Sequence, residues 1–264
     1  MNNLIKWSSR PKLKEPVLIA SWPGVSNVSL NVATYLLRKL RFRKLAVIRP
    51  VNFFEPIGVM VKNSLIEAPQ FPRSEFYYWK NPEGGDIILF IGEDQPASKT
   101  YELANLVIDV AEKYQAKRVY TCAAALTRMH HTEQSRVWGA ATSPEMLEEL
   151  RKRELVQSGA LQISGLNGLL LGLAKERGIP GICLLGEVPS YASQVPNPMA
   201  ALAIINVLTK ILNIKIDTKE LAQIAEEVKE RLKQAAATAM GEYIDYFTEP
   251  IWEYGEQEED EGEE

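Results

Sequence analysis

The side chains that could do chemistry in this sequence collect just after its predicted strands. Arg49 follows one short apolar run, Glu93 and Asp94 follow another, and Glu187 and Tyr191 lie near the end of a third. In an open α/β sheet the ligand crevice lies beyond the carboxyl ends of the parallel strands. If these side chains converge there, they form a charged pocket with perturbed protonation, which is typical of an active site.

A structural network of ion pairs explains the same charges, and we favour it because such networks also perturb carboxylates. The candidate pocket consists of Arg49, Glu93, Asp94, His131, Glu187 and Tyr191, and no catalytic role is assigned to any of them. Ser21 and Ser190 also lie at strand ends, but they lack the GxSxG pattern of a hydrolase nucleophile.

The two histidines, His130 and His131, stand side by side between a predicted strand and a predicted helix. Adjacent side chains point in different directions, so one metal ion is not expected to bind both. The sequence has no HExxH, no CxxC and no third ligand at metal spacing beside them. We therefore predict no metal site. A role as general base stays open for one of them, while loop capping or an interface contact is favoured.

Gly165, Gly168 and Gly172 open an apolar helix. The free amides of a glycine-lined helix start can bind an anion, but the spacing here is GxxGxxxG and not the dinucleotide pattern GxGxxG. Glycines spaced in this way also let a helix pack close to a sheet, and we favour that role. GxxxxGK[ST] is absent as well, so no cofactor is predicted.

The composition predicts a cytoplasmic protein that does not bind a membrane. The 264 residues are 46% hydrophobic and 24% charged, which suffices for a large core. No apolar stretch of a signal peptide follows the first residues, and the longest apolar run, 199–208, is far shorter than the ~20 residues of a membrane-spanning helix. Cys122 and Cys183 lie in strand-like runs and are expected to be buried, reduced thiols.

Charge is distributed unevenly along the chain. Residues 253–264 carry eight acidic and no basic side chains, so the net charge of -4 becomes +4 without them. Such a run cannot bury enough apolar surface to offset its ordering entropy, and we expect a disordered tail that serves solubility. A role in screening a mildly basic face or meeting a basic partner stays open. Nucleic-acid binding is not expected, because no Lys/Arg cluster with interleaved aromatic residues appears.

Apolar runs and helical patterns alternate in the first half of the chain. A strand over 16–21, a helix from Val25 to Leu40 and a strand over 44–48 predict an opening β-α-β unit with parallel pairing. Residues 53–92 show no helical period, and their short β-rich runs predict an antiparallel meander. An amphipathic helix over 103–114 and a strand over 118–124 follow.

The second half carries clear helix starts. Ser143 before Pro144, and Asn197 before Pro198, each place a capping side chain ahead of a proline, and Asp217 with Glu220 resembles a capping box. A helix over 165–177 leads into a strand over 179–188. Together these elements predict a three-layer αβα sandwich with a mixed, mostly parallel sheet. We divide the chain into one domain over 1–252, with a helical extension over 217–247, and the tail over 253–264.

Three blocks of the sequence resemble a known family. They are WPGVSNVSLNVATYL, TCAAALTRMHHTEQSRVWGAAT and LNGLLLGLAKERGIPGICLLGEVPSYASQVPNPMAALAIINVL. Over about residues 15–215 the sequence resembles the proteasome assembly chaperone family (PAC2-type). The resemblance is carried by the order of the blocks, the GIP tripeptide, the turn over 188–191 and the Asn197-Pro198 helix start. The resemblance implies a fold similar to nucleoside phosphorylases and peptidyl hydrolases, symmetric homo-oligomers of three or more subunits, and a protein-binding role.

The sequence departs from that family at its end. Some archaeal relatives end in a hydrophobic residue, a tyrosine and any residue, a motif that docks onto the proteasome ring; this sequence ends in Gly262-Glu263-Glu264, and Tyr254 lies ten residues inside. Docking by that route is not expected. The leading hypothesis is a non-enzymatic, homo-oligomeric assembly factor whose protein partner is proteasome-related. The alternative is an enzyme acting on a small molecule, either a nucleotide-dependent ligase of ATP-grasp type or a phosphorylase- or hydrolase-like enzyme. A purely structural scaffold is a third idea.

Overall fold

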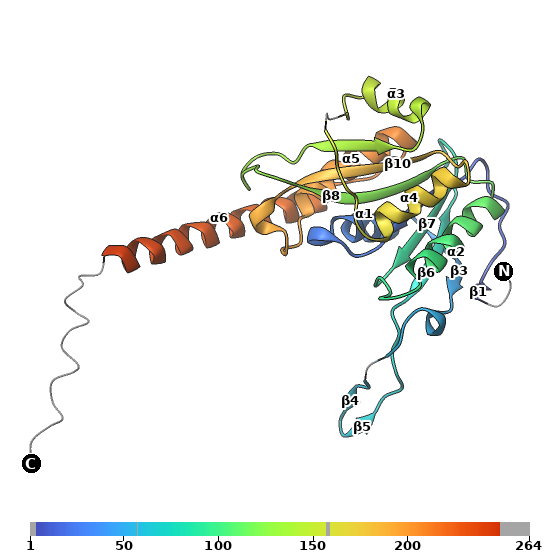
Figure 1. Cartoon of the computed structure of the whole chain (residues 1–264), viewed down its shortest axis with the longest axis horizontal. Coiled ribbons are helices and arrows are strands. Elements are labelled where there is room, and N and C mark those ends of the chain that lie inside the picture. The colour runs from blue at the N-terminus through green and yellow to red at the C-terminus, as the bar shows by residue number, and fades with distance from the viewer. Residues whose placement is uncertain (1–3, 57, 157–158, 249–264) are drawn as a thin grey trace, which may run out of the picture.

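The computed structural model describes residues 4–56, 58–156 and 159–248, with side chains up to residue 234. An eight-stranded mixed sheet forms its centre (Figure 1). The strands lie in the order β1 (Ile5–Trp7), β3 (Arg43–Ile48), β6 (Ser74–Trp79), β7 (Ile87–Gly92), β2 (Val17–Ser21), β8 (Val119–Thr127), β10 (Gly181–Pro189) and β9 (Val137–Ala141). Four neighbouring strands pair in parallel: β7, β2, β8 and β10. β3 runs in the same direction, so the predicted mixed, mostly parallel sheet is confirmed.

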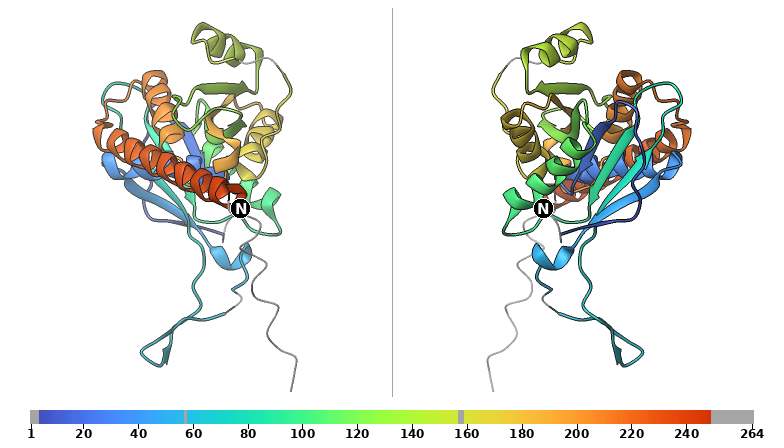
Figure 2. Two further views of the ribbon diagram at one scale, coloured as in Figure 1. Left: turned by 90° about the vertical axis from the view of Figure 1, so that its left-hand side faces the viewer. Right: turned by 90° about the vertical axis from the view of Figure 1, so that its right-hand side faces the viewer.

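Helices cover both faces of this sheet (Figures 1 and 2). α2 (Thr100–Lys113) and α4 (Leu166–Glu176) pack on one face, and α1 (Val28–Lys39), α3 (Pro144–Lys152) and α5 (Pro198–Leu212) pack on the other. Side chains alternate between the faces of a strand, so Leu18 and Ala20 of β2 join the first core while Val17 and Ile19 join the second. The three-layer fold predicted from the sequence is confirmed.

The predicted helix starts are present. The Asn197 side chain accepts a hydrogen bond from the Ala200 amide at 2.9 Å, and Ser143 caps α3 through the Met146 amide. α6 (Lys219–Thr248) begins two residues after Asp217, whose carboxylate accepts a hydrogen bond from the Lys219 amide at 3.0 Å. Glu220 forms ion pairs with Arg38 and Lys39 of α1, so it joins two helices. Figure 1 shows the second half of α6 extending away from the sheet.

Two predictions about strands are wrong or incomplete. β2 and β3 share a direction but do not pair, because β6 and β7 lie between them. The β-rich runs over 58–68 do not join the main sheet. β4 (Val61–Lys62) and β5 (Leu65–Ile66) pair only with each other, in a projecting hairpin (Figures 1 and 2). The edge strands β1 and β9 were not predicted. Each is short and its burial is partial, so the sequence carries little strand signal there.

Both cysteines are buried and free, as expected. Their strands β8 and β10 are neighbours, but Cys122 belongs to one core and Cys183 to the other, so no disulfide joins them. Burial raises the pKa of both thiols, that of Cys183 to about 12. In the part of the chain that the structure describes, no helix is long and apolar enough to cross a membrane. The acidic run over 253–264 lies outside the described residues.

Candidate functional site

The six residues of the predicted pocket do not form one site. Arg49 is exposed after β3, whereas Glu187 lies in β10, and these strands are five positions apart in the sheet, or about 24 Å at the usual strand spacing. Glu93 pairs with Arg73 of the loop before β6, through the guanidinium and through the Arg73 amide at 2.9 Å. These hydrogen bonds lower the pKa of the Glu93 carboxyl. Asp94 accepts a hydrogen bond from the next amide, that of Gln95.

Glu187 belongs to a second group. Its carboxylate is buried, with 2% of the side chain exposed, and it binds the Arg136 guanidinium at two points, each 2.9 Å long. The Glu187 carbonyl accepts a further hydrogen bond from Ser135. This bidentate pair fastens the loop before β9 onto β10, which is a structural role of the kind favoured from the sequence.

His131 and Tyr191 form a third group. The His131 amide donates to the Tyr191 hydroxyl oxygen at 2.8 Å, and the hydroxyl lies 2.9 Å from Nδ1 of the His131 ring. The Tyr191 hydroxyl thus contacts both the backbone and the ring of His131. Nε2 is buried and has no partner among the described residues. Burial lowers the pKa of His131, and His130 and Lys233 lower it further.

The crevice that this fold offers to ligands lies between β2 and β8. The chain after β2 runs through α1 on one face to β3. The chain after β8 passes through β9 and α3 and then through α4 on the other face to β10, so the two connections lead to opposite sides of the sheet. Asn167 of α4 fills the crevice: its side chain accepts from the Trp22 amide at 3.1 Å and from Ser29 at 3.3 Å, and donates to the Trp22 carbonyl at 3.2 Å. Sequence reasoning missed Asn167, because an uncharged residue within an apolar helix forms no recognisable motif.

Gln95 closes the crevice from the adjacent strand end. The side-chain NH2 of Gln95 donates to the Pro23 carbonyl at 2.6 Å, and the side-chain oxygen accepts from the Leu166 backbone amide at 2.8 Å. Gly168 packs against the Ile163 carbonyl so closely that an added Cβ would lie 1.9 Å from the oxygen. This glycine thus permits a close approach to the preceding loop and not to the sheet, which corrects the favoured role. Gly172 has open space beside it.

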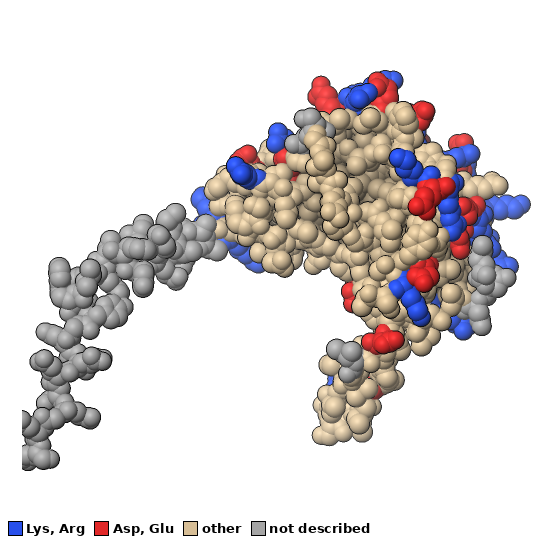
Figure 3. All heavy atoms as spheres, in the orientation of Figure 1, with Lys and Arg blue, Asp and Glu red and all other residues tan. Residues whose placement is uncertain are grey.

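Large apolar side chains are exposed around this closed crevice. The sequence has no charged residue over 16–37, 155–174 and 188–209, the segments that surround the crevice. The Ser26 amide donates to the Ser193 carbonyl at 3.1 Å and the Asn197 amide to the Ser26 carbonyl at 3.0 Å, which holds two of these segments together. Large apolar or aromatic side chains are 40–62% exposed here; we call them the apolar rim: Val25, Leu126, Leu161, Tyr191 and Val195. Figure 3 shows a broad uncharged area on the face it presents.

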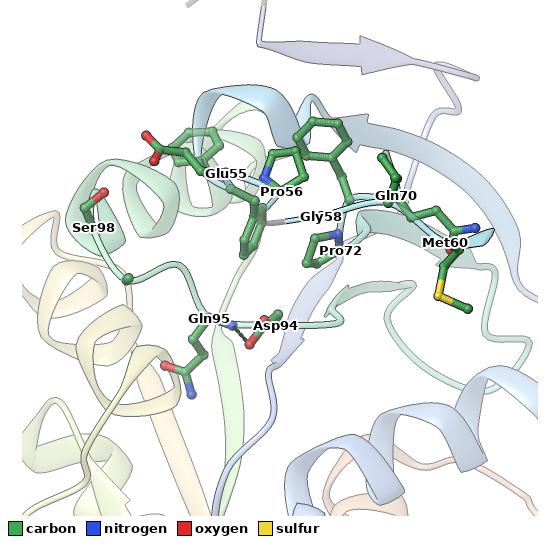
Figure 4. A pocket seen from close by; sticks show the side chains of 14 residues that line it. Glu55, Pro56, Gly58, Met60, Gln70, Pro72, Asp94, Gln95 and Ser98 are labelled. Carbon is green, nitrogen blue, oxygen red and sulfur yellow. Dashed lines mark hydrogen bonds between the residues drawn. The ribbon is translucent and has the colours of Figure 1, made fainter. Parts of the chain in front are cut away.

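The same edge of the sheet carries a projecting hairpin and a cleft over β3, β6 and β7. We call residues 58–67 the arm; its apolar side chains Val59, Met60, Val61, Leu65 and Ile66 are 48–75% exposed. A cleft of about 720 Å³ lies at the base of the arm (Figure 4). Asp94 and Gln95 form one wall and Glu55 and Pro56 the opposite wall. Within the described residues no group of three His, Cys, Asp or Glu side chains could hold a metal ion.

Comparison with known proteins places the chain in a family. The model of the PAC2 family matches residues 18–236. The chain belongs to the PAC2 family. An uncharacterised protein of Methanocaldococcus jannaschii, MJ1210, is 29% identical over 226 residues, which are 84% of this chain and 83% of that protein. The resemblance noted in the sequence is confirmed.

Solved PAC2-type structures share the fold. PbaB of Pyrococcus furiosus, described as an archaeal proteasome activator, is 30% identical with a TM-score of 0.74, over 88% of this chain and 98% of PbaB. PbaA of the same organism, described as an archaeal homolog of proteasome-assembly chaperone, is 22% identical with a TM-score of 0.69, over 92% of this chain and 96% of PbaA. The likeness to PbaA supports the fold alone.

Proposed function

We propose that this PAC2 family chain is a non-enzymatic protein-binding factor that forms a homo-oligomer in the cytoplasm and acts on a proteasome-related partner. The observation that carries the proposal is the state of the strand-end crevice. Asn167 and Gln95 fill it with hydrogen bonds to the backbone, while the side chains of the apolar rim surround it in exposed positions. An enzyme of this architecture needs that crevice open for its substrate.

The rim and the arm have the character of protein interfaces. The cores of interfaces are apolar and depleted in charge, and a monomeric protein rarely exposes large contiguous apolar patches. The uncharged segments over 16–37, 155–174 and 188–209 meet both conditions, and so does the arm with its exposed Leu65 and Ile66. We assign the rim to contact between subunits, in an oligomer of three or more, and the arm to contact with a neighbouring protein.

The proposed partner class comes from the relatives. PbaB, which is 30% identical to this chain, is described as a proteasome activator. A binding assay between the full chain and purified proteasome core particles of the same organism tests this part directly. Saturable binding at micromolar concentrations or below supports it, and no binding at a hundred micromolar contradicts it.

The self-association is tested by light scattering on surface variants. In Leu126→Lys/Val195→Lys two rim side chains become charged, and burying an unpaired charge in an interface is costly. We expect the variant to shift to monomer at concentrations where the wild type is oligomeric. Tyr101→Lys, which changes a 51% exposed aromatic side chain on α2, is the matched control and should leave the mass unchanged. Equal masses for all three proteins would contradict the assignment of the rim.

The enzyme alternative retains one supporting observation. The 720 Å³ cleft below the arm has the size of a small-molecule site, and Glu55 and Asp94 are the carboxylates that line it in the described part of the chain. A thermal-shift screen with ATP, nucleosides and phosphate separates the two functions. A ligand at 100 times its dissociation constant adds about 2.7 kcal/mol of stability, which is readily detected. A shift that Asp94→Asn abolishes would favour the enzyme.

A further inference from the structure

An unpaired basic pocket lies at the opposite end of β3 from the arm. The pocket has a volume of about 340 Å³ and is lined by Pro11, Arg41, Arg43, Tyr78, Trp79 and Lys80. Arg43 lies opposite Tyr78 across the β3–β6 pairing, so the pocket spans two strands. Three of its six lining residues are cations and none is an acid.

The charges of this pocket are not neutralised by the described part of the chain. Lys44, next to Arg43, forms an ion pair of 2.7 Å with Glu75, and Arg38 and Lys39 pair with Glu220. By contrast, Arg41, Arg43 and Lys80 are exposed and form no ion pair with any described residue. Arg10 and Lys12 flank Pro11 in the sequence and add two more exposed cations beside the pocket wall. A site with this lining attracts an extended anion.

The same chain supplies such an anion. Residues 253–264 carry eight carboxylates and no cation, and they include Tyr254, which can stack on exposed guanidinium or indole groups. The rest of the chain has a net charge of +4, so the tail and the body attract each other. We propose that the acidic tail of a second copy of this chain docks in the pocket formed by Arg41, Arg43 and Lys80.

Helix length favours docking between copies. Glu220 in the first turn of α6 binds Arg38 and Lys39, so the pocket lies near the start of α6. The 30 residues of α6 extend about 45 Å, so the tail begins far from the pocket of its own chain. The sixteen residues 249–264 span at most about 58 Å. The tail would therefore have to be almost fully extended for its carboxylates to reach the pocket of the same chain. A neighbouring pocket needs no such extension. This arrangement rests on the homo-oligomer of the proposed function.

Fluorescence anisotropy with a labelled synthetic peptide of residues 253–264 tests the pocket. The receptor is the full chain in which the eight tail acids are replaced by Gln or Asn, so that its own tail does not compete. We expect saturable binding that weakens at least tenfold between 50 and 300 mM salt, because salt screens interactions of exposed charges. In this receptor, Arg41→Glu/Arg43→Glu should weaken binding more than tenfold, and Lys80→Glu on the other strand several-fold.

The matched control is Lys152→Glu/Lys175→Glu, which reverses the same number of exposed charges outside the pocket and should change binding less than twofold. No binding by the receptor, or an equal loss in the two double variants, would overturn the inference. Light scattering on the wild-type chain keeps the two proposals apart. If the chain is an oligomer but the receptor does not bind the peptide, the docking site alone is refuted. If the chain is a monomer and the receptor binds the peptide, the pocket is supported, while docking between copies and the homo-oligomer are both refuted.

Discussion

The carboxyl-end edge of the sheet has two halves that differ in how they are filled. Over β2, β8 and β10, Asn167 closes the crevice with hydrogen bonds to Trp22, and the apolar rim is exposed around it. Over β3, β6 and β7, a cleft of about 720 Å³ stays open below the arm, and the Arg73–Glu93 ion pair lies at its margin. The half in which this architecture usually holds a ligand is thus the packed half.

This difference shows how one architecture can serve binding in place of catalysis. A few side chains that satisfy buried backbone groups remove the ligand site at little cost in stability, because each hydrogen bond replaces one to water. The exposed apolar side chains that remain around it are available to another protein. The family's fold therefore does not determine its chemistry, which depends on the residues at the crevice.

Removing the closing side chain should have the largest effect. Asn167→Ala leaves the buried amide and carbonyl of Trp22 without partners, and each unsatisfied group costs about 1–3 kcal/mol. We expect a loss of roughly 2–4 kcal/mol in the free energy of unfolding, measured with urea. Asn31→Ala on α1, whose side chain has no hydrogen bond in the described structure, should cost less than about 0.5 kcal/mol. Equal losses would mean that the crevice is not closed by Asn167.

Two glycines of α4 sharpen the comparison, since they differ only in their surroundings. Gly168→Ala places a Cβ 1.9 Å from the Ile163 carbonyl oxygen, and the shift of backbone needed should cost about 2 kcal/mol. Gly172→Ala meets nothing within 4 Å and should stabilise the helix by about 0.5–1 kcal/mol. Thermal unfolding of the two variants checks this opposite sign. A similar change in both would show that the loop before α4 does not pack as described.

Changes on the arm should affect association and not stability. Leu65→Ser/Ile66→Ser removes two apolar side chains that are 72% and 75% exposed. We expect the free energy of unfolding to change by less than about 0.5 kcal/mol, while affinity for the proteasome core particle falls at least tenfold. Val51→Ser, at a 66% exposed position outside the arm, is the control. Unchanged affinity in the arm variant would remove the arm from the interface.

The smallest expected effect is a pH dependence on the packed half. Burial holds the pKa of His131 below its ordinary value, so the unfolded chain takes up this proton at a higher pH than the folded chain. The contribution of His131 to stability is therefore complete above pH ~6.5 and is lost as the pH falls through the folded pKa. His131→Leu should flatten the dependence of the melting temperature on pH between 7.5 and 5, and His130→Gln should flatten it less, because burial is the larger cause of the lowered His131 pKa. The same slope in wild type and His131→Leu would contradict the assignment.

Local signals predicted the helices, and pairing across the chain was not predictable from them. Asn197 before Pro198 marks a helix start in any context, because the capping oxygen and the proline act within one turn. Strand order depends on contacts between distant segments. The insertion of β6 and β7 between β2 and β3 separates Arg49 from Glu187, and no pattern near either residue encodes that distance. Asn167 and Gln95 were missed for the same reason, since their partners lie 145 and 72 residues away.

Hydrogen exchange of the full chain tests the central claim most directly. It is measured at protein concentrations below and above the concentration at which the chain associates. The account predicts that association slows exchange of backbone amides at 22–29 and 190–197, beside the apolar rim, and leaves the cleft-lining segment 94–98 unchanged. Slowed exchange at 94–98 on addition of a nucleotide or phosphate, with no change along the rim at any concentration, would contradict it.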